Sequence, residues 1–74
     1  MELVLALARR WARFRGEQCV NTLIASLPPC SPGEELIVGN RCYVITRVLR
    51  ARPFPQSSEW HWEVWGRRQP GRRP

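Results

Sequence analysis

Residues 34–50, with the sequence "EELIVGNRCYVITRVLR", decide the fold class because they contain two strand-like runs joined by a two-residue turn. Both runs are rich in β-branched side chains, and Gly39 and Asn40 between them have the composition of a hairpin turn. The breaker-rich loop "RPFPQSS" (52–58) separates this hairpin from the alternating run "EWHWEVW" (59–65). The sequence therefore predicts a three-stranded antiparallel meander.

Upstream of the meander, apolar residues recur with helical periodicity. In residues 2–15 they share one face of a basic amphipathic helix, whose apolar stripe should serve the domain's only core: Leu3, Val4, Leu7, Trp11 and Phe14. Residues 17–27 repeat the spacing i, i+3, i+4, i+7 until Pro28 and Pro29, which predicts a second helix. The alternative is one long helix kinked near Gly16. We expect an α+β fold with two N-terminal helices packed on one face of the three-stranded antiparallel meander.

The length of 74 residues allows one domain with one small core. We expect residues 1–66 to form this single small α+β domain, and residues 67–74, "RRQPGRRP", to form a flexible Arg/Pro/Gly tail with nothing to bury. No run approaches the roughly 20 apolar residues of a membrane-spanning helix, and the N-terminus does not resemble a secretory signal. With an odd number of cysteines, this favours a cytoplasmic protein with reduced thiols.

Alternation along the strands predicts which side chains face the helices. On the third strand Trp60, Trp62 and Val64 are expected to face the core, and Trp65 to face outward. On the second strand the uncharged set is assigned to the core: Cys42, Val44, Thr46 and Val48. The outward sets then form an exposed apolar patch among arginines, which predicts a partner-binding surface of Tyr43, Ile45, Arg47, Leu49 and Trp65. Self-association through the same face, as a homodimer, is the alternative.

The net charge of +6 is carried by twelve arginines, and the chain contains no lysine. A basic surface attracts polyanions, and aromatic rings among arginines can stack on unpaired bases. The predicted basic surface consists of Arg9, Arg10, Arg13, Arg50, Arg52, Arg67, Arg68, Arg72 and Arg73. Arginine codon bias in a GC-rich genome, or a surface that only keeps the chain soluble, would explain the same residues.

The residues that could carry chemistry do not form a known motif. Cys19, Cys30, Cys42 and His61 have the composition of a Cys₃His zinc set, but at least ten residues separate each candidate from the next, so no short knuckle presets a site. No phosphate-binding glycine loop or paired carboxylate motif is present. We therefore expect no metal, no cofactor and no enzymatic activity.

In its shortness, basicity and lack of motifs, the chain resembles the small accessory proteins with which bacteriophages bind and redirect host machinery. The stretch "LIVGNRCYVITRV" (36–48) also resembles hairpins of SH3-like and related small barrels. The first resemblance implies a regulatory or inhibitory binding protein. The sequence thus favours a non-enzymatic protein that docks on a protein or nucleoprotein complex and modulates it, and the alternative is direct nucleic-acid binding.

Overall fold

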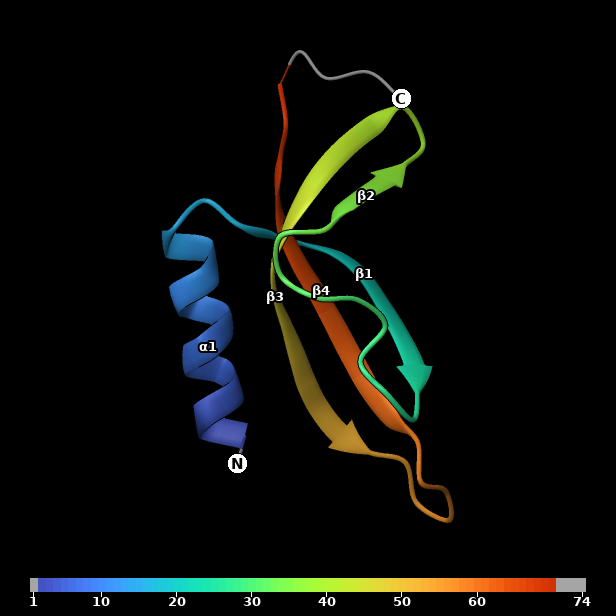
Figure 1. Cartoon of the computed structure of the whole chain (residues 1–74). Coiled ribbons are helices and arrows are strands. Elements are labelled where there is room, and N and C mark those ends of the chain that lie inside the picture. Colours follow the sequence, from blue (N-terminus) through green and yellow to red (C-terminus); the bar gives the residue numbers. More distant parts are fainter. Residues whose placement is uncertain (1, 71–74) are drawn as a thin grey trace.

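The computed structural model describes residues 2–70, which form one N-terminal helix and one four-stranded antiparallel sheet (Figure 1). The elements are α1 (Glu2–Phe14), β1 (Gln18–Ala25), β2 (Glu35–Val38), β3 (Arg41–Pro53) and β4 (Trp60–Arg68). The strand order is β1-β4-β3-β2, and the sheet curls into a half-barrel. The α+β class, the first helix and the predicted hairpin are confirmed.

The predicted second helix is wrong, because residues 18–25 form strand β1 at the edge of the sheet. Val20, Thr22 and Ile24 are β-branched and alternate, so the segment suits a strand as well as its apolar spacing suits a helix. Pairing with the tryptophan-rich strand decides between the two, since Leu23 lies opposite Trp62. The predicted meander therefore gains a fourth strand, and β4 lies inside the sheet.

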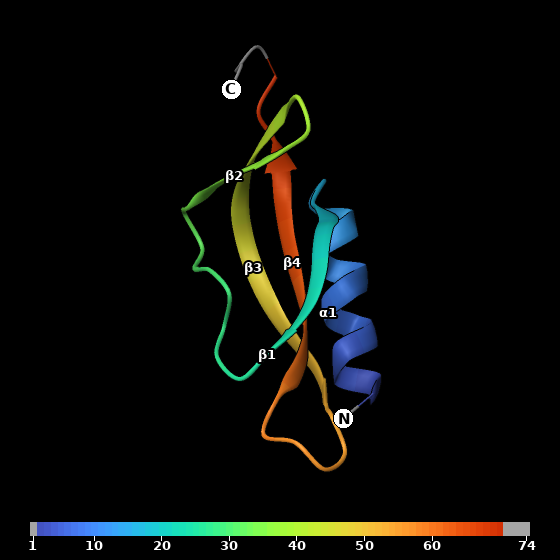
Figure 2. The ribbon, with the colours of Figure 1, turned by 90° about the vertical axis from the view of Figure 1, so that its right-hand side faces the viewer.

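The two faces of the sheet are covered by different kinds of structure (Figure 2). Helix α1 lies on one face, here named the helix face, and the connection of residues 26–34 crosses the other, the loop face. This connection is fixed by backbone hydrogen bonds in which Gly33 N donates to Ile45 O and Ile45 N donates to Glu34 O, both at 2.8 Å. Just before the connection begins, at the end of β1, Ala25 O accepts a hydrogen bond from Trp62 Nε1 at 2.8 Å.

Two β-bulges in β3, between Ile45 and Arg47 and between Arg50 and Arg52, change which face its side chains occupy. Directly paired residues of neighbouring strands point to the same face. Ile45 is opposite Gly66 and belongs to the loop face, whereas Arg47 is opposite Trp65 and belongs to the helix face. The simple alternation assumed for residues 43–49 is therefore wrong.

The core contains residues from both faces of the sheet. The largest fully buried side chains are Trp65, Ile45 and Val64. Trp62 and Cys42 are buried as predicted, and Trp60 is half-buried. The predicted orientation of β4 is reversed, however, because Trp65 lies beneath α1 while Trp62 and Val64 point to the loop face. Alternation along β4 correctly placed Trp62 and Val64 on one face and Trp65 on the other, but it could not identify which face the helix covers.

Strand β4 continues past Gly66, where the sequence analysis placed the end of the domain. Arg67 and Arg68 pair with Val44 and Tyr43 of β3, and the backbone N–H of residue 69 donates to Cys42 O at 2.8 Å. These residues belong to the sheet. The rest of the predicted tail, residues 71–74 with two of its arginines, lies outside the described residues.

Candidate docking surface on the N-terminal helix

An ion pair between Arg9 and Glu63 ties the middle of α1 to β4. Arg9 Nε donates to Glu63 Oε1 at 3.0 Å, and Arg9 Nη2 donates to the second carboxylate oxygen. Trp65 Nε1 also donates to Oε1, at 3.1 Å. The hydrogen bonds from Arg9, assisted by Trp65 and by the charge of Arg9, lower the pKa of Glu63 although its burial opposes this. The carboxylate therefore remains ionised beneath the helix.

A second ion pair fixes the C-terminal end of α1. Gly16 has a φ of 80°, a left-handed conformation that suits glycine, and the next backbone N–H, of Glu17, donates to Ala12 O at 2.9 Å. This turn directs Glu17 toward the sheet, where its side chain is only 2% exposed. Arg47 Nε and Nη2 donate to its two oxygens at 2.7 and 3.1 Å.

The buried Glu17 carboxylate lies among several cations. Arg15 and Arg67 each place a guanidinium nitrogen 3.8 Å from it, in addition to Arg47. Burial acts to raise the pKa of Glu17, but hydrogen bonds from Arg47 and Thr46 and the nearby positive charges outweigh it and lower the pKa overall. The junction of α1 and β1 is therefore held by charge pairing rather than by apolar packing.

These contacts turn the side of α1 that carries alanines toward the sheet. Ala12 is fully buried, and Leu5 and Ala8 are half-buried on the same side. The Arg13 guanidinium lies 5.6 Å from the ring centroid of Trp65, within range of a cation–π contact. The side of α1 that faces the sheet therefore carries these residues, and the predicted packing through the large apolar residues of α1 does not occur.

Those large apolar residues are exposed instead. Between 51% and 82% of each side chain is open to solvent in the set that we name the α1 stripe: Leu3, Val4, Leu7, Trp11 and Phe14. The rings of Trp11 and Phe14 are stacked, with centroids 5.9 Å apart and planes inclined by 24°. Together with Leu7 and Arg10 they line a shallow apolar hollow of about 460 Å³. The stripe is therefore an apolar side of the helix that the sheet does not cover.

Arginines border the α1 stripe on both sides. Arg10 lines the apolar hollow beside Leu7, and Arg15, one residue beyond the end of α1, lies beside Trp11. The Arg15 guanidinium lies 5.7 Å from the ring centroid of Trp11. The exposed side of α1 therefore combines an apolar centre with cationic borders.

The predicted partner patch is not an exposed surface. Tyr43, Ile45 and Trp65 are buried, with 6%, 1% and 2% exposure, Leu49 is half-buried, and Arg47 is paired with Glu17. The bulge in β3 also divides the set, because two of its members point to the loop face and three to the helix face. Their side chains contribute to the core and to the attachment of α1.

The predicted basic residues are distributed over three elements and differ in their contacts. Arg9, Arg13 and Arg67 serve the attachment of α1, as described above, and Arg50 lies 4.1 Å from the ring centroid of Trp60. Three of the predicted basic residues within 2–70 are exposed and make no hydrogen bond, ion pair or ring contact: Arg10, Arg52 and Arg68. Arg72 and Arg73 lie outside the described residues.

The candidate zinc ligands are not assembled in the part of the chain that the structure describes. No group of three or more histidine, cysteine or acidic side chains there could hold a metal ion. Cys19 is exposed, Cys30 half-buried and Cys42 buried. Desolvation raises the pKa of the Cys19 and Cys30 thiols, which makes them weaker nucleophiles at neutral pH. Among residues 2–70, no helix combines the length and apolar character needed to span a bilayer.

Compared with protein-family models, curated proteins and solved structures, the chain shows no significant match. Sequence reasoning recognised the α1 stripe but assigned it to the core. The alanines at positions 8 and 12, on the side of the helix away from the stripe, were the signal for the opposite orientation.

Proposed function

We propose that this chain is a non-enzymatic binding protein that docks on a protein partner through the α1 stripe and modulates that partner. The observation that carries the proposal is the exposure of five large apolar side chains on one helix. Soluble proteins rarely leave so continuous an apolar surface uncovered unless it binds something. The attachment of α1 by Arg9 and Arg47 holds this surface in place before the partner arrives.

The chemistry of the stripe suits a partner with an apolar groove bordered by carboxylates. Leu3 to Phe14 span roughly 17 Å along the helix, the length of a short amphipathic helix lying in a groove. Acidic groups at the rim would face Arg10 and Arg15. A second copy of the chain is a poor occupant, because its α1 stripe carries no acid that could meet the exposed Arg10 of the first copy.

A membrane surface suits the geometry less well than a protein groove. An interfacial helix uses the cations of its polar face as anchors, at about 1 kcal/mol for each arginine near an anionic surface. Here Arg9 and Arg13 contact Glu63 and Trp65 beneath the helix instead. Few basic side chains of α1 remain for lipid headgroups.

Direct nucleic-acid binding is the second candidate, supported by the exposed and unpaired Arg52 and Arg68 noted above. The two candidates differ in their response to salt. Phosphate-driven binding weakens steeply with ionic strength, by roughly 0.7–0.9 of a log–log slope unit per contact. Binding through the α1 stripe should weaken little, because apolar burial supplies most of its free energy.

The experiment places a photo-crosslinking residue at Leu7 and, as a control, at Leu27, which is 74% exposed in the connection on the other side of the sheet. We expect one acidic protein to crosslink from position 7 only, with or without nuclease. Its purified form should then lose at least tenfold in affinity for a Leu7→Ser/Phe14→Ser variant, whereas Leu27→Ser should bind normally. Circular dichroism should be unchanged, since both stripe residues are exposed.

Other outcomes contradict the proposal. Equal crosslinking from positions 7 and 27 would show that the α1 stripe is not the docking surface. Loss of the crosslinked product after nuclease treatment would favour direct nucleic-acid binding. A stable dimer in sedimentation that Leu7→Ser/Phe14→Ser dissociates would identify a second copy as the occupant. Binding to anionic vesicles that the same variant abolishes would identify a membrane.

A further inference from the structure

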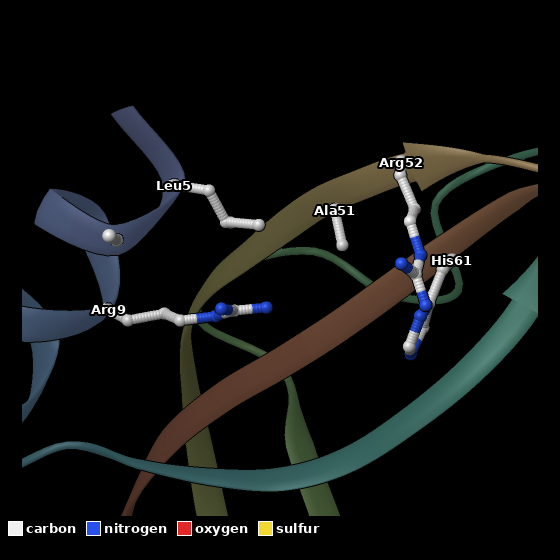
Figure 3. Close-up of a pocket in the computed structure, with 6 residues that line it drawn as sticks. Leu5, Arg9, Ala51, Arg52 and His61 are labelled. Carbon is white, nitrogen blue, oxygen red and sulfur yellow. The ribbon is translucent and has the colours of Figure 1, made fainter. Parts of the chain in front are cut away.

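A cleft of about 400 Å³ opens between α1 and the β3–β4 pair, at the end of the pair where β3 finishes and β4 begins. It is lined by Leu5, Ala6, Arg9, Ala51, Arg52 and His61. Figure 3 shows Leu5 and Arg9 extending from α1 toward the strands, while Arg52 and His61 lie side by side on the opposite wall. The volume is in the range of small-molecule sites. The cleft does not involve the α1 stripe.

The cleft is rich in hydrogen-bond donors and has no acid in its lining. Arg52 and His61 are direct partners across the β3–β4 pairing. Within residues 2–70 neither side chain makes a hydrogen bond or an ion pair. The nearby Glu63 carboxylate acts on His61 electrostatically but does not line the cleft, so an anion placed between Arg52 and His61 would be bound by both.

Arg9 contributes a third donor from the helix side. Its bonds to Glu63 use Nε and Nη2, so Nη1 has no hydrogen bond to residues 2–70. The side chain is 36% exposed, which leaves this end of the guanidinium accessible from the cleft. Because Glu63 already fixes its position, Arg9 would not have to be reordered when a ligand binds.

We propose that this cleft binds the phosphate group of a small phosphomonoester. Donors on both walls, from Arg9, Arg52 and His61, suit a tetrahedral oxyanion, whereas a planar carboxylate would be satisfied by the fork of one arginine. The apolar wall of Leu5 and Ala51 accommodates the organic group that carries the phosphate. A terminal monoester enters a cleft closed on one side by a helix more readily than the continuous chain of a phosphodiester.

The test is a titration of the full chain with inorganic phosphate and with adenosine 5′-monophosphate, followed by NMR. We expect saturable shifts of the side-chain signals of Arg9, Arg52 and His61 with both ligands. Arg52→Gln should weaken binding about tenfold, as expected for the loss of one charge-assisted contact. Arg41→Gln is the matched control, because it removes the same charge from an exposed position at the other end of β3 and should change affinity by less than about twofold.

Several results would overturn this assignment. Absence of saturable shifts at the cleft would show that it is not a phosphate site. Equal weakening of binding by Arg52→Gln and Arg41→Gln would show only a general attraction of anions to the basic chain. A dinucleotide without a terminal phosphate that binds as tightly as the monophosphate would assign the cleft to a nucleic-acid backbone instead. Partner docking should be unaffected by Arg52→Gln, so the failure of this proposal is distinguishable from the failure of the docking proposal.

Discussion

Replacing Glu63 by glutamine removes the charge that attaches the middle of α1 to the sheet, while keeping the shape of the side chain. The carboxylate accepts two hydrogen bonds from Arg9 and one from Trp65 Nε1. The amide oxygen of the variant can still accept from Trp65, but the second acceptor and the charge that face Arg9 are lost. The variant therefore isolates the ion pair from the packing around it.

The expected loss in the free energy of unfolding is about 1–2 kcal/mol. Hydrogen bonds to charged groups contribute roughly 1.5–3 kcal/mol each. The Arg9 side chain is 36% exposed, so solvent screens its share and the lower part of that range applies. For a domain of this size, each kcal/mol lowers the melting temperature by about 4–8 °C.

The assay is thermal unfolding at a series of pH values, with Glu59→Gln as the control because Glu59 is an exposed acid of the β3–β4 loop. The folded pKa of Glu63 is lowered, so the stability it contributes is present above the unfolded carboxyl value of about 4.3. That stability is lost as the pH falls through the folded pKa. The difference between the native chain and Glu63→Gln should therefore be full at pH 7 and shrink below about pH 4. Equal stability of Glu63→Gln and Glu59→Gln at pH 7, or a difference that grows with acid, would refute the role of the ion pair.

Three further changes test the core and the end of β4. Trp65→Ala should cost about 3–5 kcal/mol in unfolding free energy, because the side chain is 2% exposed, and a change under about 1 kcal/mol in denaturant titration would contradict this burial. Gly66→Ala would place Cβ 2.6 Å from Val44 O, so we expect a loss of about 1–3 kcal/mol in the same titration, and unchanged stability would mean that the strands are not this close. Truncation after Gly66 removes the Arg67–Glu17 contact and the hydrogen bond from Gln69 N to Cys42 O, so melting should occur at a lower temperature than for truncation after Pro70. Identical melting of the two truncated chains would support the domain boundary after Gly66 that the sequence predicts.

The parts of the fold that local pattern determines could be predicted from the sequence. The turn at Gly39 and Asn40 and the β-branched runs beside it identified the β2–β3 hairpin. Alternation along β4 identified Trp62 and Val64 as buried together. The arginine-flanked apolar face of α1 was also recognised, although not its exposure.

The remaining features depend on contacts between distant residues. The spacing of apolar residues in β1 fits a helix and a strand equally, and only its pairing with β4 decides. The β-bulge after Ile45 moves Arg47 to the other face without any glycine to indicate it. The position of α1 depends on two ion pairs, Arg9–Glu63 and Arg47–Glu17. The partners lie 54 residues apart in the first pair and 30 in the second.

The orientation of α1 follows from the charges beneath it. Turning the helix by about 140° would bring the α1 stripe onto the sheet, and burial of each such side chain contributes roughly 1.5–3 kcal/mol. That rotation would also withdraw Arg9 from Glu63, and a buried carboxylate left without its partner costs about 3–5 kcal/mol. It would also bring large side chains into the fully buried position of Ala12. The sheet therefore packs against the side of α1 that carries small and basic residues, and the apolar side of the helix stays exposed.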